Sequence, residues 1–321
     1  MNKESCFTIT AMIEHHLRQF LKKFHDGRAF LLALSGGPDS MVLFRLLLQE
    51  NIPFSVAHVD HGWREESGKE AQQLQELCNE CRVPFFLHKL NIQGPNLEDR
   101  CRQARYAFFR QCLTPQMQGV VLGHQADDWS ETVLKRIFEG ARLTKLSGLR
   151  PVTQFEEMTL LRPLLHVRKK QILSWLHQHG HWFFEDATNL DPRFLRSRFR
   201  LEIHPFLEKK FGKALDSSLV RLAQASLELE HHVNFYLNRY SILTEEDRVS
   251  LDFNHCIPQT DFEWRMVVSS FFERQGISIS SHSQQQIIEH LQRRSTRKTL
   301  RLKNCYVTLH RLVLTLQPVM V

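Results

Sequence analysis

The chain has 321 residues, 42% of them hydrophobic, with a formal net charge of +7 and a pI of about 9.1. This length allows two domains with full cores, and the basic charge suits either a polyanionic partner or an ordinary basic enzyme. The seven cysteines lack regular spacing, no apolar run reaches transmembrane length, and the first turns carry charges where a signal peptide is apolar. These features argue against secreted and membrane-spanning proteins, so we expect a cytoplasmic protein with reduced thiols.

Strands and helices alternate in the first part of the chain. Apolar runs predict strands at 30–34, 54–59, 85–90 and 120–123. Helical spacing predicts helices at 10–24, from 41 onward, and at 69–81, 97–112 and 128–140. Because strands that alternate with helices pair in parallel, we expect an α/β fold with a doubly wound parallel sheet. Ligands of such sheets bind beyond the carboxyl ends of the strands, where segments 35–40, 58–61 and 124–128 fall.

A glycine-rich loop follows the first predicted strand. Its residues are Ser35, Gly36, Gly37, Pro38, Asp39 and Ser40. Small residues let backbone N–H groups approach an anion at the start of a helix. The loop is not a Walker A loop, because no Gly-Lys-Ser/Thr follows it. A carboxylate repels phosphate unless a cation lies between them, so Asp39 favours Mg²⁺. The alternative is an ordinary strand-to-helix turn with a serine N-cap.

A second cluster of polar residues follows the fourth predicted strand. It contains His124, Asp127, Asp128 and Glu131. Asp128 and Glu131 are three residues apart at a helix start and therefore share one helix face. Helix capping explains one acid well, because carboxylates suit the positive end of the helix dipole. It explains three acids and a histidine less well, so these side chains are candidates for binding Mg²⁺ or a cationic substrate.

From residue 150 the pattern changes. We expect a short hairpin over 151–161, a helix at 167–179 and a turn-like segment at 183–189. A basic run follows, and a long amphipathic helix is predicted at 215–240. The last segment mixes helices at 261–275 and 283–293 with β-like alternation at 299–302 and 306–316. The basic run comprises Arg193, Arg196, Arg198, Arg200, Lys209, Lys210 and Lys213.

A second basic cluster lies near the C-terminus. Its residues are Arg293, Arg294, Arg297, Lys298, Arg301 and Lys303, with Glu289 as the nearby acid. Such a cluster is either a solvated surface or a set of phosphate contacts.

Several motifs together resemble one family of enzymes. The chain carries the SGGPDS loop, His58-Val59-Asp60-His61-Gly62-Trp63-Arg64, Asn96-Leu97-Glu98, Ala104-Arg105-Tyr106, the segment 124–140, Arg162-Pro163-Leu164-Leu165 and Glu185-Asp186-Ala187-Thr188-Asn189. These motifs resemble the tRNA(Ile)-lysidine synthetases, which are PP-loop ATP pyrophosphatases. The resemblance is firm over 29–207 and weaker beyond. Two positions depart from the family pattern: Ser197 stands where an asparagine is usual, and Asp60 precedes His61.

The resemblance implies a fold and a reaction. It implies an adenine nucleotide α hydrolase-like catalytic domain at 1–213 and a mainly helical tRNA-binding region at 214–321. ATP would adenylate the C2 oxygen of the wobble cytidine in the tRNA(Ile) with a CAU anticodon. The ε-amine of free L-lysine would then displace AMP, forming lysidine by a new carbon–nitrogen bond and changing codon reading from AUG to AUA. ATP and Mg²⁺ are the implied cofactors. Whether the chain forms a homodimer is left open by the resemblance.

The resemblance also assigns roles to residues of this chain. The implied catalytic residues are Asp39, Asp128 and Glu131, and Asp39 is also the implied Mg²⁺ ligand. The implied ATP-binding residues are Ser35, Gly36, Gly37, Pro38, Asp39, Ser40, His58, Arg105 and His124. Lysine would be bound by Asp128, Glu131 and Arg198, since it offers amines and one carboxylate. The tRNA would be contacted by Arg196, Arg200, Arg293, Arg294, Arg297 and Lys298.

Two other functions remain open from the sequence. A tRNA cytidine thiolase of the same superfamily would need cysteines for an iron–sulfur cluster. Cys78 and Cys81 form a single CxxC pair in a helical pattern, which is weak evidence, although Cys101 and Cys112 could complete a set. A non-catalytic tRNA-binding protein on this fold is the other alternative, and the intact loop with its acids argues against it.

Overall fold

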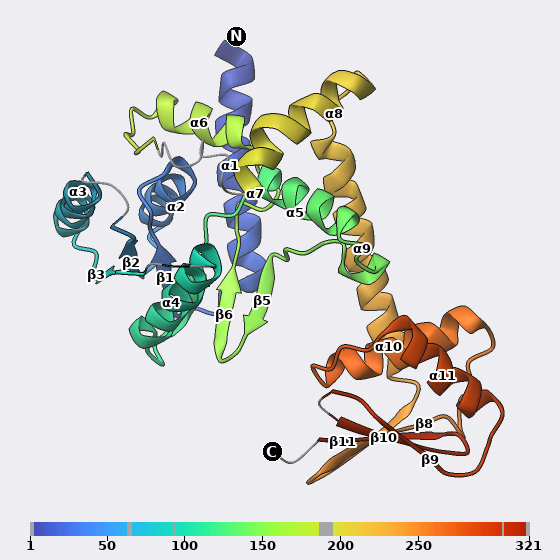
Figure 1. Cartoon of the computed structure of the whole chain (residues 1–321). Coiled ribbons are helices and arrows are strands. Elements are labelled where there is room, and N and C mark those ends of the chain that lie inside the picture. The colour runs from blue at the N-terminus through green and yellow to red at the C-terminus, as the bar shows by residue number, and fades with distance from the viewer. Residues whose placement is uncertain are drawn as a thin grey trace. The chain divides into compact units, whose positions relative to one another are not determined.

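The computed structural model describes residues 3–62, 66–92, 94, 96–185, 195–303 and 305–318 (Figure 1). The chain forms two compact units, Met1–Gln224 and Ala225–Val321, and the boundary falls within helix α9, Asp216–Leu237. The boundary expected from the sequence, between residues 213 and 214, lies just before this helix.

The N-terminal unit is built on a six-stranded sheet with the order β3-β2-β1-β4-β6-β5. Its neighbouring strands are parallel except for β5 and β6, which form an antiparallel hairpin. The strands are β1 Ala29–Ala33, β2 Phe54–Asp60, β3 Phe85–Lys89, β4 Met117–Val121, β5 Val152–Phe155 and β6 Met158–Leu161. The predicted parallel sheet and the predicted hairpin are both confirmed.

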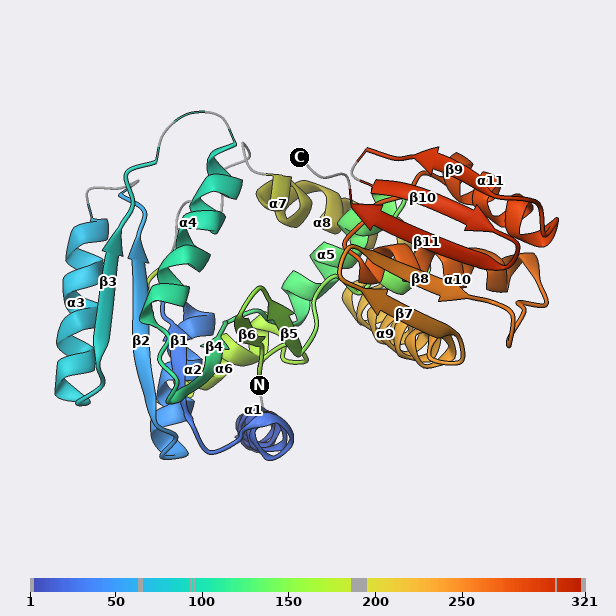
Figure 2. The same ribbon diagram turned by 90° about the horizontal axis from the view of Figure 1, so that it is seen from below.

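Helices cover both faces of this sheet because successive side chains of a strand point to opposite sides. Phe30 and Leu32 of β1 join one buried cluster, whereas Leu31 between them joins another. The first cluster contains residues of α1 Lys3–Phe24, α2 Pro38–Gln49, α3 Ser67–Glu80 and α6 Lys169–Gln178; the second contains residues of α4 Leu97–Cys112. Figures 1 and 2 show α2 and α4 on opposite sides of the strands.

Two helix starts determine where the functional groups lie. Helix α2 begins at Pro38, whose fixed φ suits the first helical position, with Gly37 as its N-cap. Helix α5, Ala126–Phe138, begins with a capping box: the Gln125 side chain accepts from the Asp127 N–H, and Asp128 accepts from the Gln125 N–H. Both starts follow the carboxyl ends of central strands, as the sequence predicted.

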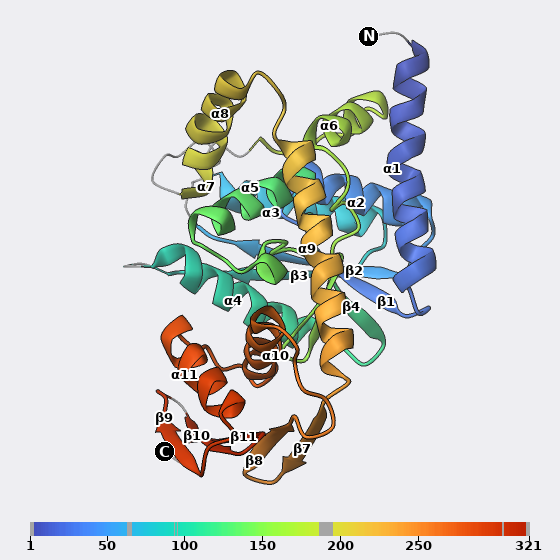
Figure 3. The same cartoon turned by 90° about the vertical axis from the view of Figure 1, so that its right-hand side faces the viewer.

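Three consecutive helical segments begin at Leu195. They are α7 Leu195–Arg198, a π-helical turn at Phe199–Ile203 and α8 His204–Phe211. Figure 3 shows α8 followed by the long helix α9. The long helix was predicted, whereas α8 was not, because its sequence lies within the basic run.

The C-terminal unit combines helices with a five-stranded antiparallel sheet of order β7-β8-β11-β10-β9. Its elements are β7 Ser241–Glu245, β8 Arg248–Asp252, α10 Asp261–Arg274, α11 Ser281–Gln292, β9 Lys298–Arg301, β10 Cys305–His310 and β11 Val313–Pro318. Both predicted helices and the predicted alternation are present. Strands β7 and β8 were not predicted, so the region holds more sheet than a mainly helical one. Among the described residues, no helix is long and apolar enough to cross a membrane.

Candidate active site

The loop between β1 and α2 is held by its two serines. The Ser40 hydroxyl donates to the carbonyl of Gly37 at 3.0 Å and accepts from the backbone N–H of Ser35 at 3.2 Å. The two serine hydroxyls lie 3.1 Å apart. The loop therefore keeps a fixed curvature at the N-terminus of α2, where backbone dipoles favour an anion.

Gly36 is required by two features of the loop. Its φ of +83° lies in the left-handed region. A Cβ at this position would lie 2.3 Å from Cδ2 of Phe184, whose backbone N–H donates to the Gly36 carbonyl at 2.8 Å. Any other residue would force the loop away from the segment that contains Phe184.

Asp39 is the acid at the centre of this loop. Its Oδ2 accepts from Lys169 Nζ at 2.8 Å, whereas its buried Oδ1 has no partner among the described residues. Burial raises the pKa of the Asp39 carboxyl, and the positive charge of Lys169 opposes that rise. Asp39 is thus half satisfied, and one oxygen remains available to a cation.

A cavity of about 320 Å³ lies beside the loop, a volume in the range of small-ligand sites. It is lined by six of the residues predicted to bind ATP: Ser35, Asp39, Ser40, His58, Arg105 and His124. A second cavity of about 410 Å³ is lined by Gly37 and Pro38, and also by Ser35, Asp39, Lys169 and Phe184. The two cavities share Ser35 and Asp39, so the loop borders both.

The two histidines of the first cavity are oriented by opposite kinds of hydrogen bond. His58 Nδ1 donates to the Leu34 carbonyl at 2.7 Å, and burial lowers the pKa of this imidazole. His58 is therefore neutral, and its Nε2 is an acceptor. His124 Nδ1 instead accepts from Arg162 Nε at 3.2 Å, which leaves the proton on Nε2. The cavity is thus lined by one histidine that carries its proton on Nδ1 and by one that carries it on Nε2.

The three acids of α5 have different surroundings. Asp127 accepts from the backbone N–H of Lys169 at 2.8 Å and pairs with Arg168 at 3.3 Å. Asp128 uses Oδ2 in the capping box at 3.1 Å. Helix capping thus explains one acid of the cluster, Asp128, as the sequence analysis allowed. Glu131 is 8% exposed and has no capping role.

Arg200 pairs with the two acids that were predicted to bind lysine. Its Nε and Nη2 lie 2.8 and 3.2 Å from the two oxygens of Glu131, and Nη2 lies 3.4 Å from Asp128 Oδ1. This fork geometry is the strong bidentate form of an arginine–carboxylate contact. Arg200 was predicted to contact tRNA. In this structure its guanidinium contacts the predicted lysine-binding acids, and the tRNA contact stays a prediction.

The remaining predicted residues are divided between the two units. Arg198 is exposed, and none of the described acids pairs with it. Arg293 and Arg294 lie at the end of α11, and Arg297 and Lys298 lead into β9, all four exposed. Several residues singled out from the sequence fall outside the described part of the chain: Trp63, Arg64, the turn 186–189 and Arg193, together with the side chains of Glu98 and Arg196.

The residues of the site that the sequence did not predict include Lys169, Phe184 and Arg168. One signal could have identified the two basic residues. Arg168, Lys169 and Lys170 stand at the start of α6, where the helix dipole disfavours positive charge. Such a placement indicates acids nearby, and Asp39 and Asp127 supply them.

A family model described as a PP-loop domain matches residues 9–207. A tRNA(Ile)-lysidine synthase of Chlamydia muridarum is 39% identical, with 91% of this chain and 92% of the relative covered. The synthase of Chlamydia pneumoniae is 38% identical, with 91% and 93% covered. The chain belongs to the tRNA(Ile)-lysidine synthase family. The prediction of an ATP-binding PP-loop ligase of this family is confirmed.

The solved structures add a likeness of fold to this family assignment. A U34-tRNA thiolase from Methanococcus maripaludis, solved with its [4Fe-4S] cluster, superposes with a TM-score of 0.57 at 18% identity, covering 70% of this chain and 79% of the thiolase. At this identity the likeness shows the fold alone.

The cysteines of this synthase-family chain give no support to the thiolase alternative. Cys78 is buried in α3, and burial raises the pKa of its thiol to about 12, which opposes the thiolate form that a metal needs. Cys101 and Cys112 are buried on α4. Among the described residues, the grouping compatible with a metal contains no cysteine and consists of His204, Glu208 and Asp216.

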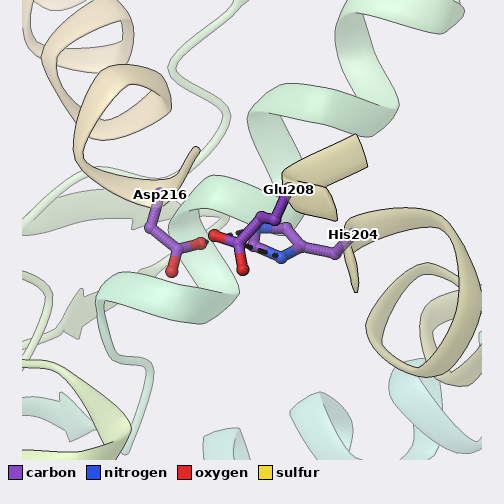
Figure 4. A group of neighbouring side chains, drawn as sticks. All are labelled: His204, Glu208 and Asp216. Carbon is purple, nitrogen blue, oxygen red and sulfur yellow. Dashed lines mark ion pairs between the residues drawn. The ribbon is translucent and has the colours of Figure 1, made fainter. Parts of the chain in front are cut away.

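That grouping is a polar junction between helices (Figure 4). Asp216 Oδ1 lies 2.7 Å from His204 Nε2 and accepts from the Ser130 hydroxyl at 2.7 Å, while Oδ2 pairs with Arg168 at 2.5 Å. Because both oxygens of Asp216 already have donors, we interpret the group as a structural link. It ties α5 and α6 to α8 and to the start of α9.

Proposed function

We propose that this chain attaches L-lysine to C2 of the wobble cytidine of tRNA(Ile) with a CAU anticodon, using ATP and releasing AMP and pyrophosphate. The observation that carries the proposal is the meeting of an anion-binding loop and paired acids. Asp128 and Arg200 are close enough to Asp39 to shift the pKa of its carboxyl. Anionic and cationic substrates can therefore be bound side by side, as this reaction requires.

We assign the first step to the loop and the first cavity. The loop N–H groups and the hydroxyls of Ser35 and Ser40 would bind the phosphates, and the cavity lined by His58, Arg105 and His124 would hold the nucleoside. Attack of the cytidine C2 oxygen on the α-phosphate forms the adenylate and releases pyrophosphate. Donors that are already oriented stabilise the charge that develops on the phosphate oxygens.

We assign a magnesium ion to Asp39. Its buried Oδ1, which no described residue contacts by a hydrogen bond, fits this role, because a carboxylate oxygen beside an anion site needs a positive charge. Bound there, Mg²⁺ would neutralise charge on the phosphates during attack. Lys169 supplies one further positive charge on the other side of the same carboxylate.

We assign the second step to Asp128 and Glu131. Their carboxylates would bind the amines of lysine, and exposed Arg198 its carboxylate. The ε-amine attacks C2 of the adenylated cytidine, AMP leaves, and the amine gives up a proton. Since Arg200 already pairs with both acids, lysine must share these carboxylates with it or replace it.

The decisive experiment is mass spectrometry of tRNA nucleosides after incubation with ATP and lysine. We expect cytidine to gain the mass of lysine less one water, only when both ATP and lysine are present. Replacing the anticodon cytidine by uridine in the transcript should abolish the product. A purified protein that releases pyrophosphate without modifying the cytidine would refute the proposal, and so would one that binds the tRNA without consuming ATP.

A further inference from the structure

Arg162 is a buried arginine whose hydrogen-bond partners are all uncharged. It is 5% exposed and stands directly after β6, at the carboxyl end of an interior strand of the sheet. Its Nη1 donates to the Arg150 carbonyl at 2.9 Å and to the Thr153 hydroxyl at 3.0 Å, and its Nε donates to His124 Nδ1 at 3.2 Å. Within the described part of the chain, this buried positive charge therefore has no carboxylate as a hydrogen-bond partner.

A buried charge of this kind normally has an opposite partner. Burial lowers the pKa of the Arg162 guanidinium, Tyr106 opposes this shift and Arg102 adds to it, and none of these influences is a carboxylate. An arginine nevertheless keeps its proton inside a protein. Arg168 and Arg200 of the same unit do pair with acids. Because an uncompensated buried charge is unfavourable, the missing counter-charge points to an anionic ligand.

The contact with His124 connects Arg162 to the first cavity. Strands β4 and β6 are parallel neighbours, with Val121 beside Leu161, so the residues that follow them meet at one edge of the sheet (Figure 2). Of the two described side chains, only His124 lines the cavity. A guanidinium has donors and no acceptor, so a ring turned to present an N–H to Arg162 would lose the contact. Arg162 therefore selects the form of His124 that carries its proton on Nε2.

The segment of His124 lies next to the anion-binding loop. A Cβ on Gly123 would come within 3.2 Å of Asp39 Cβ and of the Ser40 backbone nitrogen. The chain just before His124 is thus packed against the start of α2, where the helix dipole favours an anion. Ser35 and Ser40 line the same cavity as His124, so this cavity reaches the loop that would bind the phosphates.

We propose that Arg162 is a positioning residue of the ATP site, which holds His124 so that its Nε2–H donates to a phosphate oxygen of the nucleotide. The inference rests on the proposed function and assigns a role within it to the arginine of the Arg162-Pro163-Leu164-Leu165 motif. The nucleotide supplies the negative charge that Arg162 lacks. Hydrogen bonds in series polarise one another, so the charge of Arg162 strengthens the donor on the far side of the ring.

The first test compares two ligands of the full chain, ATP and adenosine, by their Kd values. R162M removes the charge and the donor, so we expect ATP to bind about tenfold more weakly. Adenosine carries no phosphate and should bind within about twofold of its affinity for the parent. R136M is the matched control, because Arg136 donates to the Lys145 carbonyl and lies outside both described cavities, and it should bind ATP normally. Equal losses for ATP and adenosine would overturn the proposal.

A double-variant cycle tests whether Arg162 acts through the histidine. H124A should itself weaken ATP binding, because it removes the proposed donor. R162M/H124A should then bind ATP as weakly as H124A does, since both substitutions interrupt the same chain of hydrogen bonds. Losses that add would show that Arg162 supports the fold independently of His124, and would overturn the proposal.

The tautomer can be observed directly in the parent protein. In protein labelled with ring-¹⁵N histidine, the His124 signals are identified by their loss in H124Q. We expect the spectrum of the parent to show the proton on Nε2 and a bare Nδ1. A proton on Nδ1 would overturn the proposal even if R162M does not fold. A parent that shows this tautomer and the coupled loss of ATP affinity but forms no lysidine would refute the proposed function and leave the role of Arg162 standing.

Discussion

Two carboxylate–cation pairs of the N-terminal unit, Asp39 with Lys169 and Glu131 with Arg200, are satisfied to different degrees. Asp39 accepts from Lys169 with one oxygen, and its other, buried oxygen has no partner within the described part of the chain, whereas both oxygens of Glu131 accept from the Arg200 fork. The Asp39 site can accept a cation as it stands. The Glu131 site already holds a cation of the protein and must exchange or share it. The incomplete pair can bind an ion without losing a contact. At the completed pair, a cationic substrate must compete with Arg200 for the carboxylate.

The largest effect should follow the loss of the Asp39 charge. Asp39→Asn keeps the shape but removes the charge that would bind Mg²⁺ beside the phosphates. We expect tRNA-dependent pyrophosphate release to fall more than tenfold, about 1.4 kcal/mol of barrier or more, while tRNA affinity stays near that of the parent. Retention of more than about a tenth of the parent rate would contradict the metal role. Asp127→Asn is a control, because Asp127 pairs with Arg168 and the Lys169 N–H rather than with the loop.

The second prediction concerns the completed pair, Glu131 with Arg200. Glu131→Gln should raise the KM for lysine about tenfold, because a charge-assisted contact to an ammonium is replaced by a neutral one. The KM for ATP should change less than about twofold. Asp128→Asn should act in the same direction but more weakly, since one of its oxygens is used in the capping box. Equal changes in both KM values would make these acids structural or Mg²⁺-binding residues instead.

The third prediction lies in the other unit and should leave both pairs unchanged. Replacing Arg293, Arg294, Arg297 and Lys298 by alanine should weaken tRNA binding and flatten its salt dependence. The affinity for ATP should be unaffected, since the loop and both cavities are built from residues of the N-terminal unit. Filter binding across a salt series tests this. An unchanged slope would mean that the four residues form a solvated surface.

The sequence predicted those parts of the site whose signal is local. The loop at Ser35–Ser40 and the acids of α5 are recognisable because spacing and helix position restrict their chemistry. The partners of these acids were not predictable in the same way: Lys169 is 130 residues from Asp39, and Arg200 is 69 residues from Glu131. Only the tertiary fold brings such residues together, so the local spacing of residues in the sequence does not predict the pairing.

The same contrast holds for the fold. The parallel sheet was predicted because buried strands read as short apolar runs between helices. Strand β7 was missed because four of its five residues are exposed, so it shows no apolar run and no alternation. Helix α8 was missed because its lysines were interpreted as one basic run. Its faces became distinct only when His204 and Glu208 were seen to anchor one side.

The smallest effect should come from Lys169, the cation of the incomplete pair. Burial raises the pKa of Asp39, and Lys169 is the strongest influence that lowers it. Lys169→Met removes that influence, so the pKa of Asp39 should rise further. The carboxylate is the form that binds a cation, and it is lost as the pH falls through its pKa. The acid limb of the pH–rate profile should therefore move to higher pH, with little change in the plateau rate, while Lys169→Arg keeps the profile of the parent.

Stability gives an independent check on the sign of this effect. An acid whose pKa is raised in the folded state destabilises the fold once the pH exceeds that pKa, because the buried form must carry its charge. Lys169→Met should therefore lower the melting temperature near neutral pH and have less effect in acid. Adding Asp39→Asn should recover part of the loss, since it removes the charge that Lys169 compensates. If the single and double variants melt at the same temperature, or if the acid limb stays in place, Lys169 is not the residue that keeps Asp39 ionised.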